Sequence, residues 1–250
     1  MFKTNPSFSI RGEKFNVIIL AAGFGSKAKP GADRIPKALI EISDGFRAID
    51  HLIQKYQYIA DRIIIAVGFG ADLIENYIKG KYPRLNIYFS REKEGELKSP
   101  GRSLVFALDH ASSNNPTIVT FCDYLLSDYI NVESDALCIC SPKKGDYVLD
   151  IYRNKSVIKN GFVVDLIRNK NLKDAKEGFT GLGIFHNTLL LKAITYGMAS
   201  KKTHDTVDYT SDIVKTYVSK VKTLALPIHQ QYEFGSPENL ERVKELFKWR

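Results

Sequence analysis

A glycine-containing segment between an apolar run and two prolines has the residue types of a phosphate-binding loop. It reads Leu20-Ala21-Ala22-Gly23-Phe24-Gly25-Ser26-Lys27-Ala28-Lys29-Pro30 and continues to Pro36-Lys37. Glycines directly after a buried strand let the backbone approach phosphate without obstruction by a Cβ atom, and the backbone N–H groups of such a loop can face the anion. The spacing therefore predicts a loop that binds the phosphates of a nucleotide.

The same glycines also fit the loose dinucleotide pattern G-x-G-x-x-A through Gly23, Gly25 and Ala28. That pattern requires a long helix that begins near the second glycine. Pro30 and Pro36 interrupt any helix here, because proline lacks the N–H donor and clashes with the preceding turn. The sequence therefore favours an NTP over NAD as the ligand, and an ordinary strand-to-helix turn stays open as the alternative without a ligand.

Apolar, β-branched runs alternate with helical patterns along the chain. Strands are expected at residues 15–21, 62–67 and 117–121, and helices at 48–60, 73–78 and 103–110. Such alternation predicts an α/β fold, a Rossmann-like three-layer α/β/α arrangement around a mostly parallel sheet. Ligands of such sheets bind at the carboxyl ends of the strands, where the loop above begins.

The pattern changes at about residues 145–186. Short strands at 147–152, 162–167 and 180–185 are separated by polar turns, which predicts an inserted β-rich lobe. Helices follow at 187–196 and 209–218, then a strand at 222–226 and a last helix at 236–247. We expect one domain over residues 1–250, with an N-terminal extension at 1–14.

The loop resembles the signature of the sugar-phosphate nucleotidyltransferase family, approximately L-A-A/G-G-x-G-T/S-R-L-x-P-L-T-x-x-x-P-K-x-L. The matching positions are Gly23, Gly25, Ser26, Pro30, Pro36, Lys37 and Leu39. The resemblance implies a GT-A-like nucleotidyltransferase fold whose β-rich lobe serves the acceptor. It also implies nucleotide binding by Leu20, Ala21, Ala22, Gly23, Gly25 and Ser26, and charge neutralisation on the reacting phosphates by Lys37 and by Lys27, which replaces the family's arginine.

Two acidic residues resemble the family's metal ligands. Asp123 follows the apolar run 117–121, as the aspartate of the family's Gly-Asp segment does, and Glu233 occupies the place of the aspartate in W-x-D-I-G-T-P-E-D-L. The resemblance implies that both side chains hold one Mg²⁺, an ion that takes one or two carboxylates together with phosphate oxygens and water. An aspartate at a strand end also caps turns, and this structural role is the alternative.

Three further residues fall on weaker family segments. Gly183 resembles the glycine of the G-I-Y strand and Lys170 the lysine of the E-K-P segment, and both are expected on the acceptor side. Arg102 lies where the family has the glycine-rich G-T-A-G-x-L, so it is expected to contact phosphate or nucleotide. Because that segment departs from the pattern, the base stays unassigned.

By the resemblance, an NTP and a phosphorylated acceptor, either a sugar 1-phosphate or an alcohol phosphate, would react with release of pyrophosphate. Such chemistry depends on positioning and charge neutralisation, so no general base is needed. Two alternatives stay open. One is a nucleotide-sugar-dependent glycosyltransferase, although the usual D-x-D motif is absent where the chain reads Asp123-Tyr124-Leu125. The other is a non-catalytic, nucleotide-binding regulatory protein.

The net charge and the distribution of basic residues indicate which classes of ligand the protein binds. The 36 Lys and Arg against 28 Asp and Glu give a net charge of +8, which favours anionic small molecules. Because the basic residues are dispersed and no aromatic-basic ladder accompanies them, nucleic acid is not expected. Cys122, Cys138 and Cys140 are expected to be buried free thiols. With no long apolar run and no secretory signal pattern, we expect a cytoplasmic protein with no membrane partner, and homo-oligomerisation is compatible with the sequence.

Overall fold

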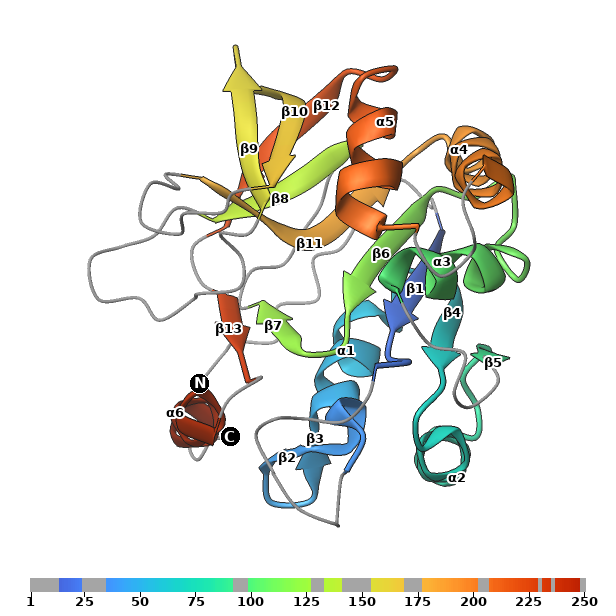
Figure 1. Cartoon of the computed structure of the whole chain (residues 1–250). Coiled ribbons are helices and arrows are strands. Elements are labelled where there is room, and N and C mark those ends of the chain that lie inside the picture. Colours follow the sequence, from blue (N-terminus) through green and yellow to red (C-terminus); the bar gives the residue numbers. More distant parts are fainter. Residues whose placement is uncertain are drawn as a thin grey trace.

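Nine strands of the chain form one sheet in the computed structural model, which describes residues 14–23, 35–91, 99–126, 133–140, 154–168, 177–201, 207–228, 231–234 and 237–247. The strands are β1 (Phe15–Leu20), β4 (Ala60–Val67), β5 (Ile87–Arg91), β6 (Thr117–Phe121), β8 (Ala136–Cys140), β9 (Asn154–Lys159), β10 (Phe162–Arg168), β11 (Gly178–Phe185) and β12 (Thr223–Pro227). Their order across the sheet is β5-β4-β1-β6-β11-β8-β12-β10-β9 (Figure 1).

The half of the sheet that contains β1 is parallel. β1 lies between β4 and β6, with Ile18 opposite Ile64 on one side and Val119 on the other. All six residues of β1 are buried, as a strand covered on both faces requires. The carboxyl ends of β1, β4 and β6 therefore meet at one edge of the sheet.

The other half of the sheet corrects the expectation of a mostly parallel arrangement. β11 runs antiparallel to both β6 and β8, and β10 runs antiparallel to β12 and β9, so the sheet is mixed. Apolar periodicity is the same for either strand direction, which is why the sequence pattern did not reveal it. β9 also pairs with β11, so this end of the sheet curls back on itself. Strands of the expected β-rich lobe thus continue the main sheet.

Helices cover both faces of the sheet and complete three layers. On one face, α1 (Ala48–Tyr56) and α2 (Ala71–Lys81) pack against β1 residues such as Val17 and Ile19. On the other face, Ile18 and Leu20 contact the cluster formed by α3 (Pro100–Leu108), α4 (Thr188–Lys201), the π-helical turn η5 (Tyr209–Val214) and α5 (Lys215–Val218). Alternate residues of a strand point to opposite faces, so one apolar strand supports both layers.

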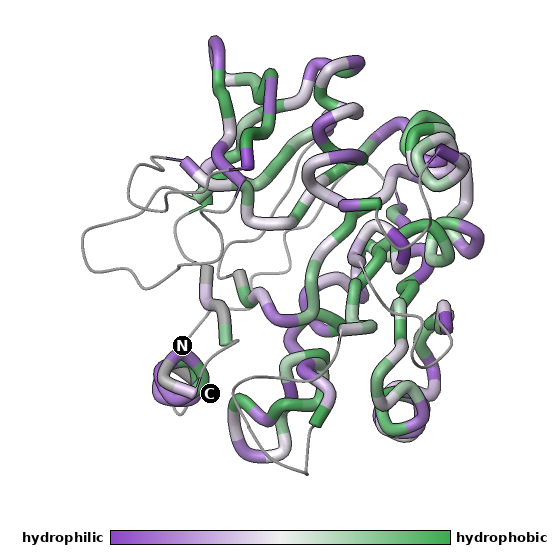
Figure 2. The backbone as a smooth tube through the Cα atoms, in the orientation of Figure 1, coloured by the Kyte–Doolittle hydropathy of each residue, from purple (hydrophilic) through white to green (hydrophobic). Residues whose placement is uncertain are grey.

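A small third core lies beside the sheet. It joins the hairpin of β2 (Glu41–Ser43) and β3 (Phe46–Arg47), the pair β7 (Tyr124–Leu126) and β13 (Gln231–Glu233), and the helix α6 (Pro237–Phe247). Its buried members include Ile42, Leu125, Phe234 and Leu240. Figure 2 shows hydrophilic and hydrophobic residues together on α6, as expected for a helix with one packed face. This core fixes β7, which directly follows Asp123.

Most expected elements are present with shifted ends. The expected strand at 117–121 matches β6, whereas the expected helix at 103–110 begins earlier, at Pro100. The expected strand at 147–152 lies outside the described residues. Cys122, Cys138 and Cys140 are buried and free, as expected. Within the described ranges, no helix is both long and apolar enough to cross a membrane.

Candidate active site

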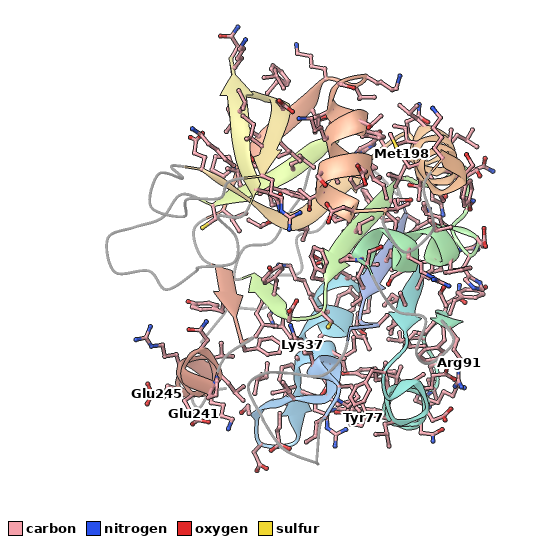
Figure 3. The ribbon with its side chains drawn as sticks, in the orientation of Figure 1. Lys37, Tyr77, Arg91, Met198, Glu241 and Glu245 are labelled. Carbon is pink, nitrogen blue, oxygen red and sulfur yellow. The ribbon has the colours of Figure 1, made fainter. Side chains whose placement is uncertain are left out.

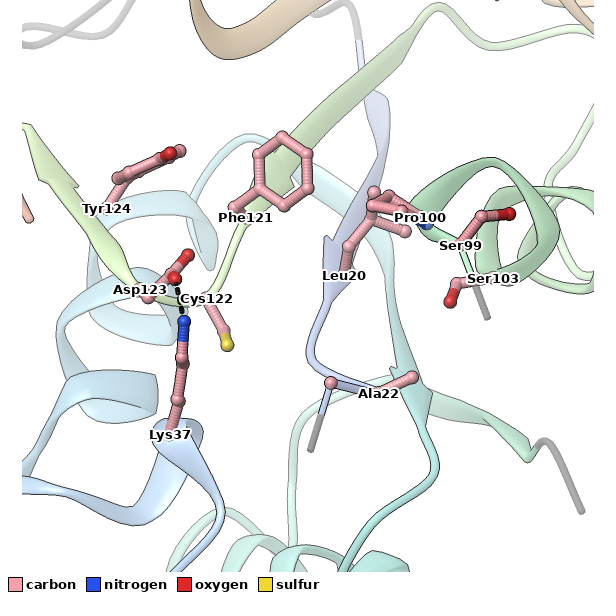
Figure 4. A pocket seen from close by; sticks show the side chains of 11 residues that line it. Leu20, Ala22, Lys37, Ser99, Pro100, Ser103, Phe121, Cys122, Asp123 and Tyr124 are labelled. Atoms are coloured by element: carbon pink, nitrogen blue, oxygen red, sulfur yellow. Dashed lines mark hydrogen bonds and ion pairs between the residues drawn. The ribbon is translucent and has the colours of Figure 1, made fainter. Parts of the chain in front are cut away.

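The carboxyl ends of β1 and β6 open into a cavity of about 400 Å³ (Figure 4). Leu20, Ala22 and Gly23 line it from the end of β1, and Phe121, Cys122, Asp123 and Tyr124 from the end of β6 and the turn after it. Lys37 and the first turn of α3 complete the lining. A cavity at this edge is where ligands of open α/β sheets bind.

Backbone hydrogen bonds hold the end of β1 in place. The N–H of Ala21 donates to the carbonyl oxygen of Ala66 at 2.9 Å, and the N–H of Cys122 donates to that of Leu20 at 3.2 Å. Ala21 itself is buried and is not among the cavity-lining residues. The backbone that leads from Ala22 into Gly23 is thereby directed into the cavity.

Lys37 is held by a short 3₁₀ turn, η1 (Lys37–Leu39). The N–H of Leu39 donates to the carbonyl oxygen of Pro36 at 2.8 Å, and Ala38 and Leu39 are buried. Pro36 packs closely on Gly70, where an added Cβ atom would lie 2.4 Å from the proline Cγ. These contacts fix the Lys37 backbone. Figure 3 shows the Lys37 side chain directed into the molecule, in contrast to Glu241 and Glu245, which lie on the outer side of α6.

Lys37 and Asp123 form a direct ion pair in the cavity. Lys37 Nζ lies 2.6 Å from Asp123 Oδ2, and the two side chains are 29% and 16% exposed (Figure 4). A charge-assisted hydrogen bond of this length between half-buried groups is stronger than a surface ion pair. The structure thus joins a predicted phosphate-binding cation to a predicted metal ligand.

Cys122 adjoins this pair but is not a candidate nucleophile. Burial, and secondarily the adjacent Asp123 carboxylate, raise the pKa of its thiol. The thiol therefore stays protonated at neutral pH, and only the thiolate is reactive. Among the described lining residues, the basic and acidic side chains are those of Lys37 and Asp123.

The first turn of α3 presents serines to the cavity. Ser99 caps the helix, since its Oγ accepts from the N–H of Arg102 at 3.2 Å, and Ser103 lies one turn further on the cavity side. Arg102 does not line the cavity; its guanidinium carbon lies 5.6 Å from the centre of the Phe106 ring on the same helix. Positions 102 and 103 are adjacent and so face different sides of the helix, and the predicted nucleotide contact of Arg102 stays a prediction.

Aromatic rings form the wall opposite α3. Phe121 and Tyr124 pack edge to face with their ring centres 5.6 Å apart. Gly181 of β11, with φ +85°, lies directly behind them, and an added Cβ atom there would be 2.4 Å from Phe121 Cδ2.

Gly183, the residue predicted for acceptor binding, is in the interior of β11 opposite Val119 and Leu137 and does not line the cavity.

The backbone of Glu233 lies near this region because β13 pairs with β7. In the antiparallel pair of β13 and β7, Glu233 is opposite Tyr124, the residue after Asp123. In the described part of the chain, no three His, Cys, Asp or Glu side chains cluster as a metal centre by themselves. One or two carboxylates nevertheless suit Mg²⁺, because substrate phosphates and water supply its other oxygens.

Four predicted residues lie outside the described part of the chain: Gly25, Ser26, Lys27 and Lys170. The structure brings together Leu20, Ala22, Gly23, Lys37 and Asp123. Sequence reasoning missed Ser99, Ser103 and the ring pair Phe121 and Tyr124. The Ser-Pro at 99 and 100 is a helix-start signal that would have placed both serines on the first turn of α3.

Comparison with known families places this cavity in context. Residues 17–133, which contain Lys37 and Asp123, match the family described as the MobA-like NTP transferase domain. A curated relative, the bifunctional protein GlmU of Campylobacter hominis, is 23% identical over 232 residues, which cover 89% of this chain. This chain spans only 50% of that relative.

Solved structures share the fold over nearly the whole chain. The CTP:phosphocholine cytidylyltransferase of Streptococcus pneumoniae superposes with a TM-score of 0.74 at 19% identity, over 94% of this chain and 100% of that one. A putative glucose-1-phosphate thymidylyltransferase of Bacillus anthracis gives 0.73 at 18% identity, over 93% and 94%. At such identities the likeness establishes the nucleotidyltransferase fold.

Proposed function

We propose that the protein is a nucleotidyltransferase, because residues 17–133 match the MobA-like NTP transferase domain. It transfers the NMP part of an NTP to a phosphorylated small acceptor, a sugar 1-phosphate or an alcohol phosphate, and releases pyrophosphate. The observation that carries the proposal is the Lys37–Asp123 pair in the cavity at the ends of β1 and β6. A cation that would bind phosphate and a carboxylate that would bind a metal are hydrogen-bonded to each other in a cavity that Gly23 also lines.

Backbone groups and lysine side chains have different roles in this proposal. Backbone groups of Ala22 and Gly23 line the nucleotide side, and Lys37, with Lys27 from the same loop, would neutralise the phosphates of the NTP. The acceptor's phosphate oxygen attacks the α-phosphorus in line with the departing pyrophosphate. Since that oxygen is already ionised, the protein needs to orient it and stabilise the growing charge rather than remove a proton.

Asp123 and Glu233 would hold a Mg²⁺ ion. Asp123 lines the cavity, and the β7–β13 register places the backbone of Glu233 opposite Tyr124, the next residue along the chain. When bound, the ion would neutralise charge on the α-phosphate and orient it for attack. Phe121 and Tyr124 would form the apolar wall that shields the reacting groups from water.

The test is a pyrophosphate-release screen with Mg²⁺. ATP, CTP, GTP, UTP and dTTP are each combined with glucose 1-phosphate, phosphocholine and inositol 1-phosphate, with EDTA and Asp123→Asn as controls against contaminating activity. We expect at least one pair to release pyrophosphate in step with formation of the nucleotide-activated product. Consumption of a nucleotide sugar without pyrophosphate would indicate a glycosyltransferase instead, and NTP binding without turnover on any acceptor would indicate a regulatory protein.

A further inference from the structure

The carboxylate of Asp123 is already engaged by a cation of the protein itself. Lys37 Nζ lies 2.6 Å from Asp123 Oδ2, and among the described residues no other side chain hydrogen-bonds to this carboxylate. A divalent cation at Asp123 would therefore meet the Lys37 ammonium at close range. Like charges that share one half-buried carboxylate repel each other strongly, because little solvent screens them.

The backbones on both sides of this pair are held in place. Asp123 is in the turn between β6 and β7, and both strands are paired to neighbours. The Lys37 backbone is fixed by the buried Ala38 and Leu39 in η1. Separation of the pair therefore takes place by side-chain rotation, and Lys37 has the longer and more flexible stem, four carbons against one.

The same ammonium lines the cavity that would receive the nucleotide's phosphates. We infer that Lys37 is an exchangeable counter-ion: it holds Asp123 until polyphosphate draws its ammonium away, and only then is Asp123 free for a divalent cation. This inference rests on the proposed function and adds to it a coupling between the two ligands. By linkage, the metal must favour polyphosphate binding by the same factor by which polyphosphate favours the metal.

The first test measures Mn²⁺ binding without any nucleotide, by electron paramagnetic resonance of the free ion. Lys37→Met removes the charge at similar length, Lys37→Gln is a second uncharged variant, and Lys37→Arg keeps the charge. We expect both uncharged variants to bind Mn²⁺ about tenfold tighter than wild type, within the range usual for coupled sites. Lys37→Arg should stay close to wild type, and Asp123→Asn should lose the site. Equal or weaker Mn²⁺ binding by the uncharged variants, including no binding in any protein, overturns the inference.

The second test measures pyrophosphate binding in EDTA by calorimetry, with no metal and no turnover. Asp123→Asn should bind pyrophosphate about tenfold tighter than wild type because Lys37 is released. The gain should vanish in Lys37→Met, as a double-mutant cycle reveals. If the gain persists in Lys37→Met, Asp123 repels phosphate directly and Lys37 is no counter-ion.

The two proposals fail separately. Loss of the proposed function would appear as absence of pyrophosphate release from every substrate pair, with the Mn²⁺ and pyrophosphate isotherms unaffected. Loss of the counter-ion role would appear in those isotherms while turnover continues. Thermal midpoints of all variants accompany both tests, so that an unfolded protein is recognised.

Discussion

Glu233 is the cross-strand partner of Tyr124, the residue that follows Asp123. The pairing brings two segments far apart in the chain to one edge of the cavity. It is held by the small third core, in which Leu125 of β7 and Phe234 after β13 are both buried. β13 is thus tied to the segment that follows Asp123, and the proposal that Asp123 and Glu233 share a metal ion stays a prediction.

We predict that Asp123→Asn folds and lowers metal-dependent pyrophosphate release by about a hundredfold or more, the scale of losing one transition-state electrostatic contact. Asn keeps the size of the side chain but removes the charge that would hold Mg²⁺. Glu233→Gln should lower turnover in the same direction, and raised Mg²⁺ should partly restore it. Steady-state rates across a Mg²⁺ titration, with thermal midpoints, provide the measurement.

Asp165→Asn is the matched control for this prediction. Asp165 also pairs with a lysine, since Lys215 Nζ lies 2.9 Å from its Oδ1, but the pair is on β10 and α5, away from the cavity. Its turnover should equal wild type. An Asp123→Asn protein that turns over normally would refute the metal assignment, and one that unfolds would make Asp123 a structural cap.

Lys27 remains a prediction from the sequence, because it lies outside the described residues. We expect Lys27→Arg to keep or raise turnover and Lys27→Ala to lower it, since phosphate needs a cation and the planar guanidinium binds it with two hydrogen bonds. Initial rates over a range of NTP concentrations give kcat and KM separately. Full activity of Lys27→Ala would make the residue an ordinary surface lysine.

Local sequence patterns predicted the parallel half of the fold well. The runs that became β1, β4 and β6 are apolar and β-branched, and that composition reports burial on both faces. The direction of β11 was beyond such reasoning, because alternation and burial do not depend on strand direction. The pairing of β7 with β13 depends on packing between distant segments, which no local pattern reports.

For the candidate site too, the sequence predicted single residues but not the contacts between distant segments. The glycine loop with Lys37, and Asp123 at a strand end, could be proposed one at a time from residue types and spacing. Their direct ion pair could not, because it depends on how η1 and the turn after β6 approach each other in space. Arg102 was proposed for phosphate from its charge; it lies on α3 with its guanidinium carbon 5.6 Å from the centre of the Phe106 ring, and its role stays a prediction.

The buried carboxylate of Asp50 should be important for stability. It is fully buried and accepts hydrogen bonds from Tyr77 Oη at 2.6 Å, Tyr82 Oη at 2.8 Å and Lys81 Nζ at 2.8 Å, which joins α1 to α2. Figure 3 labels Tyr77 on α2. Asp50→Ala leaves these donors without their acceptor, so we expect a loss on the order of 3 kcal/mol in the free energy of unfolding.

Asp72→Ala is the control for the Asp50 prediction. Asp72 also bonds a cation, Arg91 Nη2 at 2.7 Å, but its side chain is 80% exposed. Water screens that pair, so the change should stay within about 0.5 kcal/mol. Urea unfolding of both variants decides it, and equal effects would show that burial of Asp50 does not set its contribution.

Gly101 should tolerate no side chain, because α3 approaches the backbone of Val207 there. A Cβ atom at Gly101 would lie 2.3 Å from the Val207 carbonyl oxygen and 2.8 Å from its carbon, and a backbone group cannot move aside cheaply. Gly101→Ala should therefore lower the free energy of unfolding by about 2 kcal/mol, the middle of the overpacking range, and weaken NTP binding by displacing Ser99 and Ser103. Gly80→Ala is the matched control: Gly80 is in α2 with nothing within 4 Å of its added Cβ, so alanine should stabilise by about 0.5–1 kcal/mol. Urea unfolding and NTP titration of both variants test this, and a Gly101→Ala protein as stable as Gly80→Ala would contradict the close packing of α3.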